Sequence, residues 1–266
     1  MQHLIQVIKQ KKELKDISDD FVKDHLIKYQ TKHNIKILPT NPKSKDFKII
    51  VKDIRAELRK VYGLFRNKDN AKLRNELIQQ PNQKNIHLQI LQTHASTKER
   101  LPFYKDLYTE IFKITKKPKT ILDLGCGINP FSIPFMKIKP IYHAYDINEE
   151  EITNINQYFQ KNNIKGKAEL LDISKTTKLK LLPKSDLAFL FKVSAILDQG
   201  KGHKKTEEVI DATPAKYVVV SFPTLTMSGK PMTAPRRSWM EWLCKRRNWD
   251  YNIIEFKNEI YYVLKK

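Results

Sequence analysis

A loop that contains two glycines, near the middle of the chain, has the residue types of a cofactor-binding turn. Residues Thr120–Leu124 form an apolar run with Asp123 near its end, and Gly125 and Gly127 follow one residue apart. Glycine lets a backbone turn tightly and approach a ligand without a Cβ in the way. In a parallel α/β sheet, ligands bind beyond the carboxyl ends of the strands. The pattern predicts a strand and a nucleotide-type loop, with a purely structural turn as the alternative.

Two classes of cofactor fit this loop. A dinucleotide-binding G-x-G-x-x-G pattern needs a third glycine where Pro130 stands, so that pattern is incomplete. Asp123, just before the loop, could accept a hydrogen bond from an amino group, which S-adenosylmethionine (SAM) carries and which dinucleotide sites do not have to satisfy. The residues therefore favour SAM over a nicotinamide cofactor.

Acidic residues also end two further predicted strands. Asp146 closes the run 141–146 and lies 21 residues after Gly125, which is the separation of an acid that binds ribose hydroxyl groups. Asp172 closes the run 168–172. Three carboxylates along one sheet edge suit a cationic, hydroxylated ligand with an amine, although a helix N-cap is the alternative for each one. Further strands are predicted at 186–191, 217–222, 251–256 and 259–264, and a helix at 149–161.

The segment before the glycine loop predicts a helix with cations in its first turn. Ser96 and Glu99 have the spacing of a capping box, and apolar residues continue at helical steps to about Lys113. Lys98 and Arg100 would lie where the helix dipole disfavours positive charge. We interpret them as an anion site, with simple solvent exposure as the alternative.

Length and composition limit the classes of protein to which this chain can belong. The 266 residues allow one large or two ordinary domains, and 40% hydrophobic residues suffice for a core. The chain has neither an apolar run of about 18 residues nor the apolar core of a secretory signal. Cys126 and Cys244 are too few for a disulfide scaffold, and the seven histidines show no metal-ligand spacing. We therefore expect a cytoplasmic protein with no metal and no membrane segment.

The charge predicts a polyanionic partner. The formal charge of +21 is uneven, because residues 1–120 carry 27 Lys and Arg against 13 Asp and Glu. Lysines that neutralise phosphates release counterions, which favours nucleic acid as the partner, with a solvated basic surface as the alternative. We expect contacts with RNA from a basic connector and from the segment before a predicted carboxyl-terminal helix. These residues are Lys43, Lys45, Lys48, Lys230, Arg236 and Arg237.

The chain divides into two predicted domains. Residues 1–92 show helical spacing, for example over 21–29 and 54–65, and a short apolar run at 47–51 is the one strand-like stretch. Residues 93–266 alternate strands and helices, which predicts an α/β, Rossmann-like domain with seven strands, and with SAM as the favoured cofactor we expect a SAM-dependent methyltransferase domain. The first domain would be a helical, basic, RNA-binding lobe, or an ordinary helical cap over the second.

If SAM is the cofactor, the residues narrow the methyl acceptor. Transfer to an exocyclic amine typically uses an Asn/Asp-Pro-Pro-aromatic segment, and residues 191–194 read Phe-Lys-Val-Ser instead. Transfer to pyrimidine C5 needs a thiolate, and neither Cys126 in the loop nor Cys244 in a predicted helix suits that role. Guanine N7 already holds an in-plane lone pair, so positioning alone suffices and no general base is expected.

At these motifs the chain resembles the aminoglycoside-resistance 16S rRNA (guanine-N7)-methyltransferases, which act in the decoding region of the small ribosomal subunit. The resemblance covers about residues 94–262 and is looser before them. Its motifs are HASTKERL at 94–101, LDLGCGINP at 122–130, DLAFLFK at 186–192, SFPT at 221–224 with Ser228 and Gly229, and NEIYY at 258–262.

The resemblance implies roles for single residues. Arg100 looks like the partner of the SAM methionine carboxylate, and Asp123, Gly125, Gly127 and Asn129 look like the loop under the methionine part. Asp146 would bind the ribose, Asp172 would lie near the adenine amino group, and Lys192 ends a family motif at the same site. The implied partner is 16S rRNA within the small subunit, bound by a monomer.

The sequence departs from the family pattern at one position, and two other functions remain as alternatives to 16S rRNA methylation. The family usually has an arginine after SFPT, and Leu225 stands there, which affects the placement of the substrate. The first rival is a methyltransferase of the same fold that acts on another rRNA site or on tRNA. The second is a non-catalytic RNA-binding or ribosome-assembly protein, against which the intact set of Asp123, Gly125, Gly127 and Asp146 argues.

Overall fold

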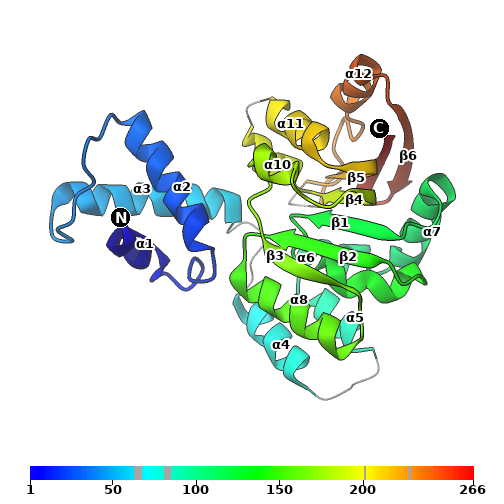
Figure 1. The fold of residues 1–266 in the computed structure, drawn as a ribbon, viewed down its shortest axis with the longest axis horizontal. Coiled ribbons are helices and arrows are strands. Elements are labelled where there is room, and N and C mark those ends of the chain that lie inside the picture. Colours follow the sequence, from blue (N-terminus) through cyan, green and yellow to red (C-terminus); the bar gives the residue numbers. More distant parts are fainter. Residues whose placement is uncertain (63–67, 81–84, 201, 227–228) are drawn as a thin grey trace.

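A seven-stranded sheet organises most of the chain in the computed structural model, which describes residues 1–62, 68–80, 85–200, 202–226 and 229–266 (Figure 1). The strand order is β3-β2-β1-β4-β5-β7-β6, in which the first five strands are parallel and β7 is antiparallel to both neighbours. The strands are β1 (Thr120–Leu124), β2 (Ile141–Asp146), β3 (Gly166–Leu170), β4 (Ser185–Phe191), β5 (Ala215–Pro223), β6 (Asp250–Phe256) and β7 (Glu259–Lys265). The predicted α/β class with seven strands is confirmed.

Helices cover both faces of this sheet. In β4, Leu187 and Phe189 pack into one core cluster, while Ala188 and Leu190 pack into the other. Side chains alternate between the faces of a strand, so a strand covered on both sides reads as a continuous apolar run. The covering elements are α4 (Lys68–Gln79), α5 (Ile86–Gln92), α7 (Tyr104–Thr115), η2 (Asn129–Met136) and α8 (Glu149–Lys161) on one face, and α9 (Thr176–Leu179), α11 (Lys204–Ala212) and α12 (Ser238–Arg247) on the other.

The first three helices form a separate cluster, here called the N-lobe. They are α1 (Gln2–Lys9), α2 (Asp19–Lys32) and α3 (Lys45–Tyr62), and Figure 1 shows them beside the sheet, toward the end where β1 and β2 finish. Their buried side chains run from Leu4 to Leu58. The strand-like run at 47–51 lies inside α3, because its buried residues continue at helical steps to Ile54 and Leu58. The predicted helix end at residue 65 lies outside the described residues.

The helix predicted from Ser96 to Lys113 is two helices. The first is α6 (Ala95–Arg100) and the second is α7, and Leu101–Phe103 between them form turns. Pro102 lacks an N–H and so cannot extend the helical hydrogen-bond ladder. The capping box is also wrong, because α6 begins after His94 and has no side-chain cap.

The division at residue 93 stays a prediction. Leu77 and Ile78 of α4 and Ile90 and Leu91 of α5 come before residue 93 in the chain, yet they pack into the core cluster of the sheet. Side-chain packing therefore groups α4 and α5 with the sheet rather than with the N-lobe. Limited proteolysis of the full chain would test which division reflects independent folding.

None of the described helices is long and apolar enough to cross a bilayer. Both cysteines, Cys126 and Cys244, are buried and free.

Candidate functional site

A cavity of about 620 Å³ lies at the carboxyl ends of β1, β2 and β4. This is the edge where open α/β sheets bind ligands, and the volume falls within the range of roughly 300–1,000 Å³ that is usual for small-molecule sites. Seven of the eight predicted cofactor residues line it. They are Arg100, Gly125, Gly127, Asn129, Asp146, Asp172 and Lys192.

The glycine loop adopts a conformation that only glycine takes easily. Gly125 has φ of +67° and Gly127 has φ of +48°. A Cβ on Gly125 would lie 2.8 Å from Cγ1 of Val193, whereas a Cβ on Gly127 would meet nothing within 4 Å. Gly127 also lines the cavity, so its missing side chain leaves room there for a ligand.

Two of the strand-end acids face the cavity and also hold local turns. Asp146 accepts hydrogen bonds from the backbone N–H of Gly127 at 2.8 Å and of Asn148 at 3.0 Å. Asp172 accepts one from the N–H of Ser174 at 2.9 Å. A carboxylate has about four acceptor positions, so each can still receive hydrogen bonds from a ligand. Each of these two aspartates can therefore hold its local turn and bind a ligand at the same time.

Asp123 is placed differently from the other predicted cofactor residues. It is 1% exposed and does not line the cavity. Its Oδ2 accepts hydrogen bonds from the hydroxyl of Tyr142 at 2.6 Å and from Nδ2 of Asn129 at 3.0 Å. Burial raises the pKa of Asp123 to about 7, although these hydrogen bonds act in the opposite direction. This carboxyl group can support the loop from beneath, and its predicted contact with a cofactor lacks support from this placement.

Arg100 forms a buried ion pair on the cavity wall. Its Nε and Nη2 donate to the two carboxylate oxygens of Glu259 at 2.9 and 2.8 Å, and its guanidinium lies over the ring of Phe191. The solvent-exposure alternative for Arg100 is wrong, because the residue is 2% exposed. Arg100 also lines the cavity, and a guanidinium carries five N–H donors, of which Glu259 takes two. The first-turn position predicted for Arg100 is also wrong, because it is the last residue of α6.

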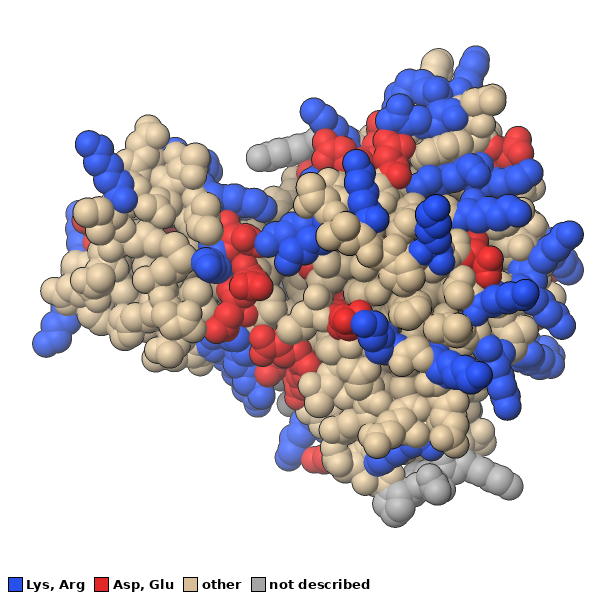
Figure 2. All heavy atoms as spheres, viewed as in Figure 1, with Lys and Arg blue, Asp and Glu red and all other residues tan. Residues whose placement is uncertain are grey.

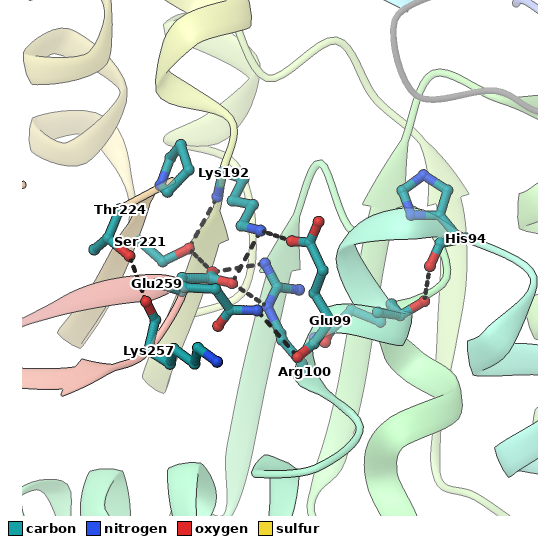
Figure 3. Close-up of polar contacts among 12 residues, drawn as sticks. His94, Glu99, Arg100, Lys192, Ser221, Thr224, Lys257 and Glu259 are labelled. Atoms are coloured by element: carbon teal, nitrogen blue, oxygen red, sulfur yellow. Dashed lines mark hydrogen bonds and ion pairs between the residues drawn. The ribbon is translucent and has the colours of Figure 1, made fainter. Parts of the chain in front are cut away.

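Glu259 is the centre of a wider charged cluster, drawn in Figure 3. Lys192 lies with its Nζ 3.3 Å from Glu259 and 2.6 Å from Glu99, and the hydroxyl of Ser221 donates to Glu259 at 2.5 Å. Burial alone would raise the pKa of Glu259, but the positive charges of Arg100 and Lys192, with the hydrogen bonds, hold it below its usual value. The two cations, Arg100 and Lys192, and the two carboxylates, Glu259 and Glu99, balance, so this cluster carries no net formal charge.

A second buried ion pair, together with a neutral histidine, lines another part of the cavity. Arg74 binds both carboxylate oxygens of Glu151, and its Nη1 donates to the hydroxyl of Thr93 at 2.9 Å. Burial lowers the pKa of His94 to about 4, and the nearby cations Arg74, Arg100 and Lys192 act in the same direction. His94 is therefore uncharged at neutral pH.

The predicted RNA-binding residues are spread over two regions. Lys43, Lys45 and Lys48 are exposed between α2 and the first turn of α3. Lys230 is exposed in the hairpin that follows β5, where Leu225 pairs with Pro231. Ser228 of the same motif lies outside the described residues.

The two arginines before α12 are already engaged. Arg236 is exposed and pairs with Glu241 at 3.1 Å. Arg237 is half-buried, donates to the carbonyl oxygens of Ala234 and Pro223, and lies over the ring of Phe222, so its first role is to hold this loop. These contacts do not prevent either arginine from binding RNA, but Arg237 has few N–H donors left for such a contact.

Sequence reasoning missed four residues at this site: Glu259, Arg74, Glu151 and His94. The NEIYY and HASTKERL motifs contain Glu259 and His94, so a signal was present for these two. Arg74 and Glu151 are 77 residues apart, and no local spacing marks them as partners. No group of three or more His, Cys, Asp or Glu side chains in the described part of the chain is arranged to hold a metal.

Comparison with known proteins gives consistent matches. A family described as "Ribosomal RNA methyltransferase (FmrO)" matches residues 45–263. A 16S rRNA (guanine(1405)-N(7))-methyltransferase of Micromonospora echinospora is 29% identical over 183 residues, which cover 66% of this chain and 64% of the relative. A relative with the same name from Frankia casuarinae is 26% identical and is covered to 62%. These alignments thus span somewhat less than two thirds of the relatives' length.

Solved structures share the fold. The 16S rRNA methyltransferase RmtF, solved with S-adenosyl-L-homocysteine, has a TM-score of 0.79 at 21% identity and covers 100% of this chain and 97% of its own. The 16S rRNA methylase ArmA has a TM-score of 0.59 at 28% identity and covers 74% of this chain and 97% of its own.

Proposed function

Because this chain belongs to the FmrO family of ribosomal RNA methyltransferases, we propose that it transfers the methyl group of SAM to N7 of a guanine in 16S rRNA. Family membership confirms the resemblance seen in the motifs. Relatives named 16S rRNA (guanine(1405)-N(7))-methyltransferase support the position of the methyl group and the class of RNA.

The observation that carries the proposal is the cavity at the sheet edge with its glycine loop. SAM would supply an electrophilic methyl group on a sulfonium, and the residues on the cavity wall fit its parts. Arg100 offers donors for a carboxylate, Asp146 offers acceptors for ribose hydroxyl groups, and Asp172 offers acceptors for an amine. Figure 2 shows acidic side chains, with basic ones beside them, where the N-lobe meets the sheet, and the cavity lining likewise carries charges of both signs.

The reaction needs positioning rather than proton transfer. Guanine N7 has a free lone pair that attacks the methyl carbon as the carbon–sulfur bond breaks, and the products are 7-methylguanine, positively charged, and S-adenosylhomocysteine. No proton has to leave the acceptor, so the site requires no general base. This agrees with a neutral His94 and with a Cys126 thiol whose pKa is raised by burial.

The RNA would be bound within the small ribosomal subunit. The exposed lysines of the N-lobe, Lys43, Lys45 and Lys48, can neutralise phosphates, and the chain as a whole carries +21. We propose that the protein acts as a monomer in the cytoplasm, where the subunits are assembled. Light scattering of the purified protein tests the oligomeric state.

Transfer of a labelled methyl group from SAM tests the proposal. Isolated small subunits, large subunits and tRNA are offered separately, and primer extension then maps the modified base. We expect label on small subunits alone and a single guanine in the decoding region. Labelling of tRNA or large subunits would move the activity to another substrate. Absence of SAM binding by calorimetry would leave a non-catalytic RNA-binding protein.

The second candidate for the methyl acceptor is a different guanine of 16S rRNA. Leu225 stands where the family usually has an arginine, and it forms part of the hairpin after β5. An apolar side chain at this position cannot donate a hydrogen bond to a phosphate, as an arginine can. Primer extension on the labelled subunits distinguishes the two candidates directly.

A further inference from the structure

Helix α2 of the N-lobe has two faces with different surroundings. Val22 and Leu26 are fully buried in the N-lobe core. Phe21, His25 and Lys28, spaced four and three residues apart, line the cavity, and Phe21 belongs to the N-lobe core as well. This spacing places the three side chains on one stripe of the helix. Phe21 is 6% exposed, and its ring packs against that of His25 with centroids 4.8 Å apart.

The chain just before α2 is joined to the segment that follows β2. Ile17 and Asn148 form an antiparallel bridge, in which the N–H of Ser18 donates to the carbonyl of Ile147 at 3.1 Å and the N–H of Glu149 donates to that of Asp16 at 2.8 Å. Ile147 also packs against the N-lobe core. Ile147 directly follows Asp146, so the N-lobe is attached beside the acid proposed for the ribose.

A second attachment lies on the segment that follows β3. Asp24 of α2 forms an ion pair with Lys175, three residues after Asp172. Ile196 of α10 (Ser194–Asp198) packs against the N-lobe core as well. The face of α2 that carries Phe21 and His25 is thus held between the two acids proposed for the ribose and for the adenine amino group.

We propose that this face of α2 forms part of the cofactor site, with Phe21 and His25 in contact with the purine nucleoside half of the bound cofactor. The inference rests on the proposed function. Aromatic side chains bury a planar base through their faces. None of the cavity residues next in sequence to the two acids is aromatic, so α2 supplies the aromatic surface there. These residues are Ile147, Asn148, Leu171, Ile173 and Ser174.

A consequence is that the N-lobe serves two ligands. The N-lobe carries the lysines proposed to bind RNA, and its α2 closes the cofactor cavity. Cofactor binding and RNA binding then favour the same placement of the N-lobe, and each ligand strengthens the binding of the other by the same factor.

Calorimetry with two ligands tests the contact in the full chain. S-adenosylhomocysteine carries both halves of the cofactor, and 5′-methylthioadenosine carries the nucleoside half with a methylthio group. For Phe21→Ala we expect both ligands to bind about tenfold more weakly, because an aromatic contact with a base is lost. The matched control is Val22→Ala, one residue along the same helix, which loosens the N-lobe core and leaves both affinities at the wild-type value.

If circular dichroism shows that Phe21→Ala does not fold, the His25→Ala variant tests the inference in its place. We expect it to weaken 5′-methylthioadenosine severalfold. The inference is overturned if both variants bind this ligand as the wild type does, or if Val22→Ala weakens it as much as Phe21→Ala. If the wild-type protein binds neither ligand, the proposed function fails instead.

Discussion

Two buried carboxyl groups in the central sheet have opposite protonation behaviour. Glu259 begins β7 and is 0% exposed, and Asp123 lies near the end of β1 and is 1% exposed. The pKa of Glu259 is held below its usual value, whereas the pKa of Asp123 is raised to about 7. Burial is the same for both and favours the protonated form.

The difference comes from the partners. Glu259 accepts from the guanidinium of Arg100 and lies near the ammonium of Lys192, so its charge is compensated. Asp123 accepts only from the hydroxyl of Tyr142 and the amide of Asn129 among its hydrogen bonds that the structure describes, and neither donor carries a charge. A buried carboxyl group is therefore charged where cations reach it and close to neutral where they do not.

Glu259→Ala should have the largest effect. It leaves Arg100 and Lys192 buried or half-buried without their shared partner, and removing one member of a buried ion pair typically costs about 3–5 kcal/mol. Urea unfolding at pH 7.5 measures the loss in the free energy of unfolding. The matched control is Glu255→Ala, an exposed glutamate of β6, which should change stability by less than about 0.5 kcal/mol. Equal losses in the two variants would contradict the ion-pair account.

Asp123→Asn should stabilise the protein at high pH. The folded-state pKa of about 7 lies above the usual 3.8, so the folded protein holds a proton that the unfolded chain has lost. The stability contributed by Asp123 therefore falls as pH rises from about 4 to about 7. One pKa unit is worth about 1.4 kcal/mol, so a pKa raised by about 3 sets an upper limit of about 4 kcal/mol on the gain of the variant over the wild type at pH 8.

Urea unfolding of both proteins at pH 5 and pH 8 measures this gain. The gain should be clearly larger at pH 8 than at pH 5, because at pH 5 only part of the stability lost between about pH 4 and about pH 7 has disappeared. Asp250→Asn, at an exposed position of β6, controls for the loss of a carboxylate and should show no such pH dependence. A gain that is equal at both pH values would contradict a raised pKa.

These two carboxyl groups also mark the limit of sequence reasoning. Strand runs and the acids at their ends depend on local spacing, so β2 and helix α8 were predicted with their observed bounds. The partners of Glu259 depend on tertiary packing, because Arg100 is 159 residues away in the chain. Asp123 was found by its position before the loop, but its burial beneath Asn129 depends on how η2 packs. Local pattern thus locates the acids, and packing decides what each one does.

Asp146→Ala tests a third carboxylate, one that faces the cavity. Its removal takes away acceptors for the ribose and for the N–H of Gly127, so SAM should bind about tenfold more weakly, at a cost of roughly 1 kcal/mol in stability. Calorimetry measures the affinity. Asp146→Asn is the matched variant, because it keeps one neutral acceptor and should lose less. Wild-type affinity in the alanine variant would remove Asp146 from the proposed site.

Changing Lys43, Lys45 and Lys48 together to Glu should have the smallest effect on stability, because these side chains are exposed and fully solvated. We expect a change below about 0.5 kcal/mol for each substitution. Binding to small subunits should weaken, and the slope of log K against log salt should become shallower by about 0.7–0.9 for each phosphate contact that is lost. Filter binding at several salt concentrations measures this slope.

The control places the same charge change at the opposite edge of the sheet. Lys117, Lys119 and Lys139 are exposed beside the amino ends of the strands, since Lys117 and Lys119 precede β1 and Lys139 precedes β2. Three Lys→Glu changes lower the formal charge by 6, from +21 to +15, in either variant. A general effect of net charge would therefore reduce the slope equally in both. A reduction confined to the N-lobe variant assigns the RNA contact to that lobe, and an equal reduction refutes it.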